Sequence, residues 1–178
     1  MLREVLVPKG TTMRTNLFLL LVMFSFSVAA QKESTPVKTT SPIVEYGDPI
    51  TLDNAKKVLK AAEAFAVGNQ WTVVIAIVDS GGNLVLLEKL DHTQFGSIEV
   101  AIGKAKTAIN FKRPTKLLED AVANGGVGLR LLAVPGVFPL EGGELILSNG
   151  KIIGAIGVSG MQSTQDAEVA KAGLAALK

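Results

Sequence analysis

The chain has 178 residues, of which 48% are hydrophobic, a formal net charge of +2 at pH 7 and no cysteine. This length allows one domain with a sizeable core but not two, and the lack of cysteine excludes disulfides, thiolate metal sites and a cysteine nucleophile. The nearly balanced charge gives no reason to expect binding to nucleic acid or to an anionic membrane.

The first 30 residues have the layout of a secretory signal peptide. Arg14 precedes the apolar run LFLLLVMF, and the small residues SVAA end just before Gln31. The apolar run is short for a bilayer span, although an uncleaved anchor is the alternative, and Met13 is an alternative start of the chain. Cleavage after residue 30 leaves fifteen basic and fifteen acidic residues, which predicts a near-neutral protein in the periplasm or outside the cell.

Residues 31–49 are rich in Thr, Ser, Lys and Pro and contain few large apolar side chains. This composition is typical of a flexible leader. We expect contact between the leader and the domain only through Ile43, Val44 and Tyr46, and we expect the domain itself to occupy residues 50–178.

The first half of the domain shows the apolar spacing of helices and strands in turn. The expected elements are a helix at 52–67 capped by Thr51 or Asp53, strands at 71–79 and 84–90 around the turn 80–83, a helix at 97–111 and a short helix from Thr115 to about 123.

The helix at 97–111 is expected to bury one face, which carries Ile98, Ile102, Ala105 and Ile109. Lys104 falls almost opposite that face, and Lys106 falls on its border. Both lysines are therefore expected to be solvated, unless Lys104 reaches a ligand carboxylate across a subunit interface.

The second half is organised around a hairpin with Asn149-Gly150 at its turn. Asn-Gly between two apolar runs favours a type I′ turn, which needs positive φ at both central residues. The following strand is apolar at nearly every position, so we expect it to be covered on both faces. Residues 129–134 are compatible with a short helix or a strand, 135–143 with a loop, and 164–177 with a last helix capped by Ser163 or Thr164. Together these elements predict an α+β domain with a largely antiparallel sheet.

Glycines recur at positions 154, 157 and 160 in the sequence GAIGVSG. Their spacing is not that of a dinucleotide-binding loop. Bare backbone at these positions serves either the close packing of a helix or the approach of a ligand, and a small anion could bind the backbone amides before the last helix.

His92 is the only histidine and follows the second predicted strand. A neutral imidazole suits a general base or an axial haem ligand, and an exposed loop histidine without a role is the simpler interpretation. One histidine without cysteine cannot build a typical zinc site, and no G-x-S-x-G motif supports a serine hydrolase. The pairs Asp79 with Asp91 and Glu141 with Glu144 could serve acid–base chemistry or simply occupy turns and strand edges.

Several segments occur in an order that is informative as a set: VVIAIVDSGGNLV at 73–85, LD at 90–91, KAKTA at 104–108, RPT at 113–115, PGVFPLEGG at 135–143 and NGKIIGAIGVSG at 149–160. This set spans the domain and resembles the GlcG/HbpS-like family, also called the haem-degrading-domain family. The chain departs from that family's pattern where Lys89-Leu90-Asp91-His92 replaces the usual Arg-Met-Asp-Gly, and where Glu144 replaces a common proline.

The resemblance implies a profilin-like sandwich, in which a central antiparallel sheet of about five strands has helices on both faces, and assembly into homo-oligomers. It also implies binding of haem or another flat tetrapyrrole, with His92 as the iron ligand, Lys104 or Lys106 paired with a propionate, and Phe111 or Phe138 lining the ring. The full set of expected cofactor contacts is Asp91, His92, Lys104, Lys106, Phe111, Thr115, Phe138 and Gly157.

Two other classes of function are compatible with the sequence. One is an enzyme acting on a small carboxylic or enol-like substrate, with Asp91 and His92 as acid–base groups. The other is an oligomeric interaction module that binds no small molecule. We expect no nucleic-acid partner, and no stable membrane span after cleavage.

Overall fold

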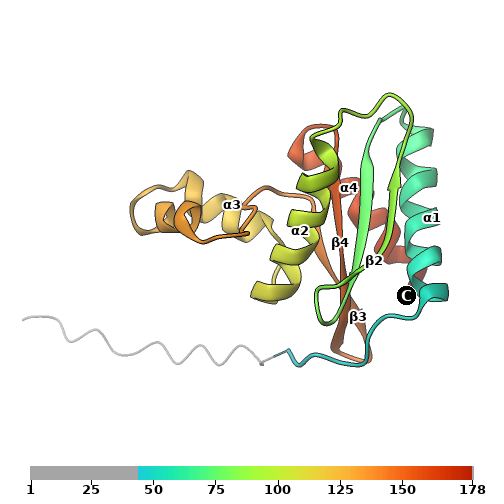
Figure 1. Cartoon of the computed structure of the whole chain (residues 1–178), viewed down its shortest axis with the longest axis horizontal. Coiled ribbons are helices and arrows are strands. Elements are labelled where there is room, and N and C mark those ends of the chain that lie inside the picture. The colour runs from blue at the N-terminus through green and yellow to red at the C-terminus, as the bar shows by residue number, and fades with distance from the viewer. Residues whose placement is uncertain (1–43, 178) are drawn as a thin grey trace, which may run out of the picture. The chain divides into compact units, whose positions relative to one another are not determined.

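The computed structural model describes residues 44–177, which form a four-stranded antiparallel sheet in the order β2-β1-β4-β3 with helices on both faces (Figure 1). The elements are α1 (Leu52–Gly68), β1 (Val74–Asp79), β2 (Leu84–Lys89), α2 (Ser97–Phe111), α3 (Lys116–Ala123), η1 (Gly126–Ala133), β3 (Gly143–Ser148), β4 (Lys151–Ser159), α4 (Ser163–Leu174) and η2 (Ala175–Leu177), where η is a 3₁₀ helix. The predicted α+β class and two-sided helical cover are confirmed, with four strands in the described part where about five were expected.

Residues 1–43 and 178 lie outside the described residues, and with them the predicted signal peptide and most of the predicted leader. No helix of the described part is both long enough and apolar enough to cross a membrane.

The central strand is β4, which pairs with β1 on one side and with β3 on the other. Every residue of β4 after Lys151 is buried, as its continuous apolar sequence predicted. The turn before it has φ values of 49° at Asn149 and 75° at Gly150, so the type I′ geometry expected from Asn-Gly is present.

One face of the sheet is covered by α1 and α4, which also pack against each other. The core on this side joins Val58 of α1, Ile75 and Ile77 of β1, Ile156 of β4 and Val169 of α4. The apolar face of α1 forms from the spacing that its sequence predicted, and Thr51 caps the helix by accepting a hydrogen bond from the Asn54 N–H.

The other face is covered by α2, whose backbone lies almost directly on the sheet. A Cβ added at Gly157 would lie 2.1 Å from the Ala101 carbonyl oxygen, and one added at Gly143 would lie 2.5 Å from the Lys104 carbonyl oxygen. The glycine at position 157 therefore permits close helix packing, and it is not exposed to a ligand.

The last helix begins with a cap that the sequence analysis did not predict. Gln162, and not Ser163 or Thr164, is the N-cap residue, and it forms a reciprocal capping box with Gln165. Glutamine is an uncommon cap, so the preference for serine and threonine pointed to the wrong residue.

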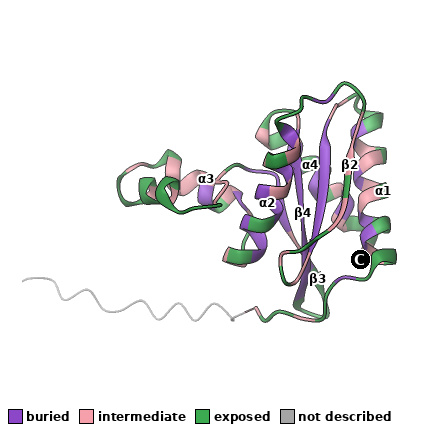
Figure 2. Ribbon diagram, in the orientation of Figure 1, coloured by how far each residue is buried: buried purple, intermediate pink, exposed green. Residues whose placement is uncertain are grey.

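The segment containing α3 and η1 stands away from the sheet, and we call residues 116–134 the arm (Figure 1). The stretch at 129–134, for which helix and strand were both open, belongs mostly to η1. Leu118 is the buried residue of α3 and η1 has none, so the arm exposes much of its surface (Figure 2).

The described part begins with a segment that is attached to the domain. Tyr46 forms a parallel bridge with Ile152, and its hydroxyl donates a hydrogen bond of 2.7 Å to the Ile109 carbonyl oxygen. The Lys112 ammonium donates to the Val44 carbonyl oxygen at 2.9 Å and lies 4.2 Å from the centre of the Tyr46 ring. Val44 and Tyr46 therefore attach the start of the described chain to the beginning of β4 and to the C-terminal end of α2.

Candidate functional site

One side of the edge strand β2 has no helix packed over it. The helix α2 lies over β4, β1 and β3, while β2 forms the edge of the sheet beyond β1. Residues directly opposite each other in an antiparallel pair point to the same face. Leu87 and Lys89 lie opposite Ala76 and Val74, which pack under α2, so these two β2 side chains share the α2 side of the sheet.

We call this region the open face. It consists of Leu84, Leu87 and Lys89 of β2, Phe95 of the following loop, and Ile98 and Ile102 of α2. The two leucines are exposed, and the two isoleucines are partly buried against the cluster formed by β1 and α2. An apolar strip of this kind at the edge of a domain is a candidate surface for a ligand or a partner.

The loop that ends the open face is fixed by Thr93. This threonine is buried, and its hydroxyl lies 2.7 Å from the Leu90 carbonyl oxygen and 3.1 Å from the Val73 carbonyl oxygen. The preceding residue, His92, is exposed and has a left-handed backbone with φ of 65°. A non-glycine residue in this conformation is held there by its surroundings, so the backbone of the loop is fixed at His92.

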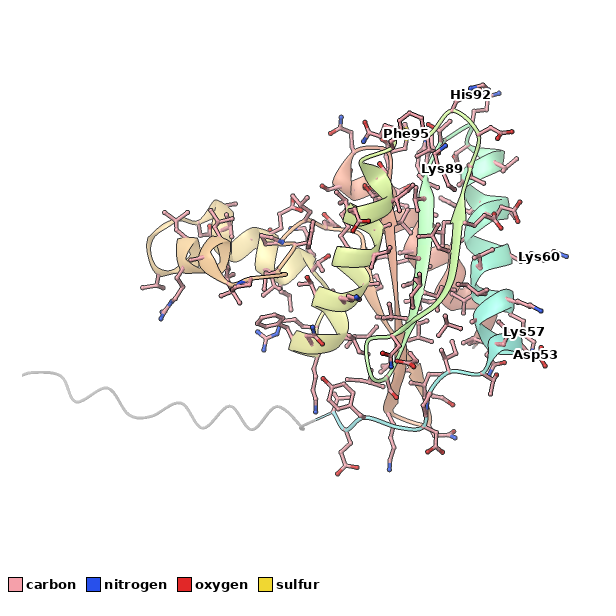
Figure 3. All side chains as sticks on the ribbon, viewed as in Figure 1. Asp53, Lys57, Lys60, Lys89, His92 and Phe95 are labelled. Atoms are coloured by element: carbon pink, nitrogen blue, oxygen red, sulfur yellow. The ribbon has the colours of Figure 1, made fainter. Side chains whose placement is uncertain are left out.

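Phe95 is 85% exposed, which is unusual for a large aromatic side chain. The Lys89 ammonium lies 5.6 Å from the centre of the Phe95 ring, within the range of a cation–π contact. Figure 3 shows Lys89, His92 and Phe95 together at one end of the sheet. An exposed imidazole, an exposed aromatic ring and a cation therefore lie at the same end of the sheet. Groups of these kinds could ligate a metal, stack on a flat ring and pair with a carboxylate.

The structure contradicts the expected exposure of Lys104. Its side chain is 2% exposed, and its ammonium donates hydrogen bonds to the Asp166 carboxylate at 2.8 Å and to the Val158 carbonyl oxygen at 2.9 Å. The helical period places Lys104 opposite one expected buried face, but α2 is packed on this side as well, where Gly142 and the start of β3 at Gly143 lie against Lys104. The lysine is thus enclosed by protein, and its charge is already paired inside the domain.

Burial affects the acidic partner of this lysine. Desolvation raises the pKa of Asp166, while the Lys104 ammonium and the Met161 N–H lower it. Because the carboxylate accepts from both of these donors, the pair is satisfied without any ligand.

Three other expected cofactor contacts form part of the framework. The Thr115 hydroxyl is buried and accepts a hydrogen bond of 2.9 Å from the Gly143 N–H, so it does not cap α3 with its side chain. Gly157 lies beneath α2, as described above. The backbone N–H of Phe138 donates to the Thr107 hydroxyl at 2.9 Å, and the Phe138 ring packs on α2.

The remaining expected contacts are not all close together. Asp91 and His92 are neighbours in the exposed loop before α2, and Lys106 is exposed on α2. Phe111 is the last residue of α2, roughly 21 Å along the helix axis from Ser97 at a rise of about 1.5 Å per residue. Of the eight expected residues, Asp91 and His92 therefore lie in the loop between β2 and α2 that also carries Phe95.

Lys89 and Phe95 were not identified as ligand contacts from the sequence. A signal was present, because Lys89, His92 and Phe95 recur at intervals of three residues across one turn. The exposure of Leu84 and Leu87 could not be predicted from such a spacing. It depends on how far α2 extends across the sheet in the folded domain.

The single imidazole near the open face could bind a metal ion whose other ligands belong to a cofactor. The described residues contain no group of three or more histidine or acidic side chains that could hold a bare metal ion. A single imidazole is enough for an iron already bound in a planar macrocycle, which needs only an axial ligand from the protein. The apolar strip and the exposed ring fit the flat face of such a group.

Comparison with known proteins identifies the family to which the chain is similar. Residues 50–175 match the model of a family described as haem degrading protein HbpS-like. The chain is 39% identical over 105 residues to protein GlcG of Escherichia coli strain K12, which covers 59% of this chain and 77% of that protein.

Two solved structures share the fold. The crystal structure of the PduOC:heme complex is matched with a TM-score of 0.67 and 29% identity, covering 73% of this chain and 96% of that chain. A double mutant of HbpS from Streptomyces reticuli is matched with a TM-score of 0.69 and 30% identity, covering 81% of this chain and 97% of that chain.

Proposed function

Because the chain belongs to the HbpS-like family, as its ordered motifs predicted, we propose that it binds haem or a closely related tetrapyrrole on the open face. The similar PduOC protein was crystallised with haem. The observation that carries the proposal is the position of His92, the sole histidine, on a fixed loop at the end of an exposed apolar strip.

His92 is the axial ligand in this proposal. A bound haem would supply the iron, and an imidazole nitrogen of His92 would ligate it. The buried Thr93 anchors the loop, so little backbone entropy is lost when His92 becomes a ligand.

The ring and its carboxylates are held by residues other than those expected from the sequence. Phe95 stacks on the macrocycle, and Leu87 and Ile98 contact its apolar edge. The Lys89 ammonium takes the place assigned to Lys104 or Lys106, because it lies beside Phe95 and is not used in an ion pair among the described residues.

Hemin titration followed by the Soret band tests the proposal. Wild-type protein is expected to give a shifted Soret band of a histidine-ligated iron, and the His92→Ala variant is expected to lose this spectrum and to bind at least about tenfold more weakly. Lys60→Ala, an exposed change on α1, is the matched control and should behave as wild type. An unchanged spectrum and affinity in His92→Ala would remove the proposed site.

We also propose that the protein is exported and handles or senses haem or iron outside the cytoplasm. The arrangement of residues 1–30 supports export. Mass spectrometry of the protein from fractionated cells is expected to find a chain beginning at Gln31 in the periplasm or the medium. Recovery of the intact chain from the cytoplasm alone would contradict this proposal.

A homo-oligomer formed through the arm is the last element of the proposal. Val127 is 76% exposed, and Leu117, Leu129 and Leu132 of the same arm are also exposed. Several large apolar side chains exposed on one short segment favour burial against another protein surface. Light scattering is expected to show an assembly that Leu132→Glu dissociates, and a monomeric wild-type protein would exclude the assembly.

A further inference from the structure

A second candidate binding region lies at the other end of the sheet, where three hollows adjoin. Their volumes are about 370, 310 and 200 Å³. The first and second share Asn54, Ser148 and Ile153, while the second and third share Leu147 and Leu177. Because neighbouring hollows share lining residues, they adjoin one another, and we call the three together the foot groove, which lies between the start of α1, the β3–β4 hairpin and the end of the described chain.

The foot groove changes character along its length. The first hollow is lined by polar side chains that include Thr51, Asn54 and Ser148. The third is lined, among the described residues, only by the apolar side chains of Leu145, Ile146, Leu147, Leu174 and Leu177. A ligand that fills the groove therefore needs a polar end and an apolar end.

The charge at the middle of the groove is positive. Among the described residues, Lys57 is the one charged residue that lines the second hollow. Its ammonium donates a hydrogen bond to the Asn54 side-chain oxygen at 3.3 Å and forms no ion pair with a described residue. In the first hollow Lys151 lies 3.6 Å from Glu45, and Asp48 is also present, so the charges there are largely balanced.

We propose that the foot groove binds a linear amphiphile with an anionic head, of the class of medium-chain fatty acids. The carboxylate lies beside Lys57, with the Ser148 hydroxyl as a hydrogen-bond donor, and the alkyl chain runs over Leu147, Leu174 and Leu177. This site goes beyond the haem proposal and is separate from it, because Figure 3 shows Lys57 and His92 at opposite ends of the domain.

The alkyl chain provides a quantitative expectation. Each CH₂ group buried against the leucines strengthens binding roughly three- to fourfold. Affinity is therefore expected to rise from octanoate to dodecanoate, measured below the concentrations at which micelles form. Displacement of a fluorescent fatty-acid analogue, such as dansyl-aminoundecanoate, gives the affinity of each acid.

Two variants of α1 separate the groove from general surface charge. Lys57→Glu places a negative charge in the groove and is expected to weaken dodecanoate binding at least about tenfold. Lys60→Glu makes the same change on the same exposed side of the helix (Figure 3) but lies outside the three hollows, and it should bind as wild type. Leu147→Asp is expected to abolish binding, and its side chain is exposed enough for the fold to survive the change.

Three results would overturn the proposal. The first is equal dodecanoate affinity in Lys57→Glu and wild type. The second is equally tight binding of dodecyltrimethylammonium, whose head carries the opposite charge. The third is competition by hemin or loss of dodecanoate binding in His92→Ala, since either would place the fatty acid on the open face. Failure of hemin to bind at all would leave the foot groove unaffected, so the two proposals fail separately.

Discussion

The Lys104 ammonium and the Asp166 carboxylate meet 2.8 Å apart, and each side chain is only 2% exposed. The two residues come from α2 and α4, on opposite faces of the sheet, and the lysine also donates to β4 through the Val158 carbonyl oxygen. A buried charge without its partner is costly, whereas a buried pair and an apolar replacement of the pair can be similar in free energy.

Replacing one partner of this pair should therefore destabilise the domain strongly. Lys104→Met leaves Asp166 buried with only N–H donors, and we expect the free energy of unfolding to fall by about 3–5 kcal/mol. The double variant Lys104→Met with Asp166→Leu should recover much of that loss, because no charge is left behind. Urea denaturation of the four proteins measures the coupling, and additive effects of the two substitutions would contradict it.

Gly157→Ala should be among the most damaging single methyl additions. The new Cβ would lie 2.1 Å from the Ala101 carbonyl oxygen, so α2 would have to move from the sheet. We expect a loss of about 3 kcal/mol or more in the free energy of unfolding. Gly68→Ala at the end of α1 is the control, since a Cβ there meets nothing within 4 Å and the change should be neutral or slightly stabilising.

Glu88 on β2 should make the protein less stable as the pH rises. Burial raises the pKa of Glu88, and the negative charge of Glu63 raises it further. One Glu88 carboxyl oxygen is buried and has no hydrogen-bond partner among the described residues. The folded protein therefore holds this proton more tightly than the unfolded chain, so stability falls as the pH rises through the window between the ordinary carboxyl value near 4.5 and the raised value.

The Glu88→Gln variant removes this pH dependence. Its melting temperature should exceed that of wild type at pH 7, and the difference should disappear below about pH 4, where both states of the wild-type carboxyl are protonated. Thermal unfolding followed by circular dichroism across this range measures the effect. Glu99→Gln, a change at an exposed position of α2, is the control and should not shift the pH profile.

Phe95→Ala should affect hemin binding without affecting the fold. The ring is 85% exposed, so its removal costs little stability. Loss of stacking on a flat ligand should weaken hemin binding about three- to tenfold. A hemin titration beside a urea denaturation separates the two effects, and a lower unfolding midpoint with unchanged hemin affinity would give Phe95 a purely structural role.

The role of the Lys89 charge can be tested by comparing a ligand that carries carboxylates with one that does not. Lys89→Gln should weaken the binding of hemin, whose propionates are negative, by about 0.5–1 kcal/mol, as expected for an exposed ion pair. It should leave the binding of hemin dimethyl ester unchanged, because the ester carries no carboxylate. Equal losses for both ligands would show that Lys89 acts by positioning Phe95 and not by pairing with a propionate.

The elements that could be predicted from the sequence are those with a local signal. Asn149-Gly150 specified its turn, the apolar run after it specified a strand covered on both faces, and Thr51 with the following apolar spacing specified α1. Each of these signals lies within a few residues of the structure it determines.

The errors concern positions that are decided by distant parts of the chain. Lys104 is buried because Asp166, 62 residues later, lies beside it, and the period of α2 alone cannot show a second packed side. The open face exists because α2 does not extend over β2, which depends on the order of the strands. His92 and Asp91 could be found as polar residues in a loop, but their relation to Leu87 and Phe95 is a property of the folded sheet.

The attachment of Val44 and Tyr46 to the domain also determines the orientation in which the protein can be immobilised. Tyr46 is fastened beside Ile152, where β4 starts, whereas His92 follows the end of β2, which lies beside the start of β1 and the end of β4. A tag or surface linkage joined directly to Val44 would therefore leave from the end of the sheet remote from His92. Protein immobilised on a sensor chip in this orientation should keep its hemin-binding end facing the flowing solution, whereas the fatty-acid groove would be turned toward the chip.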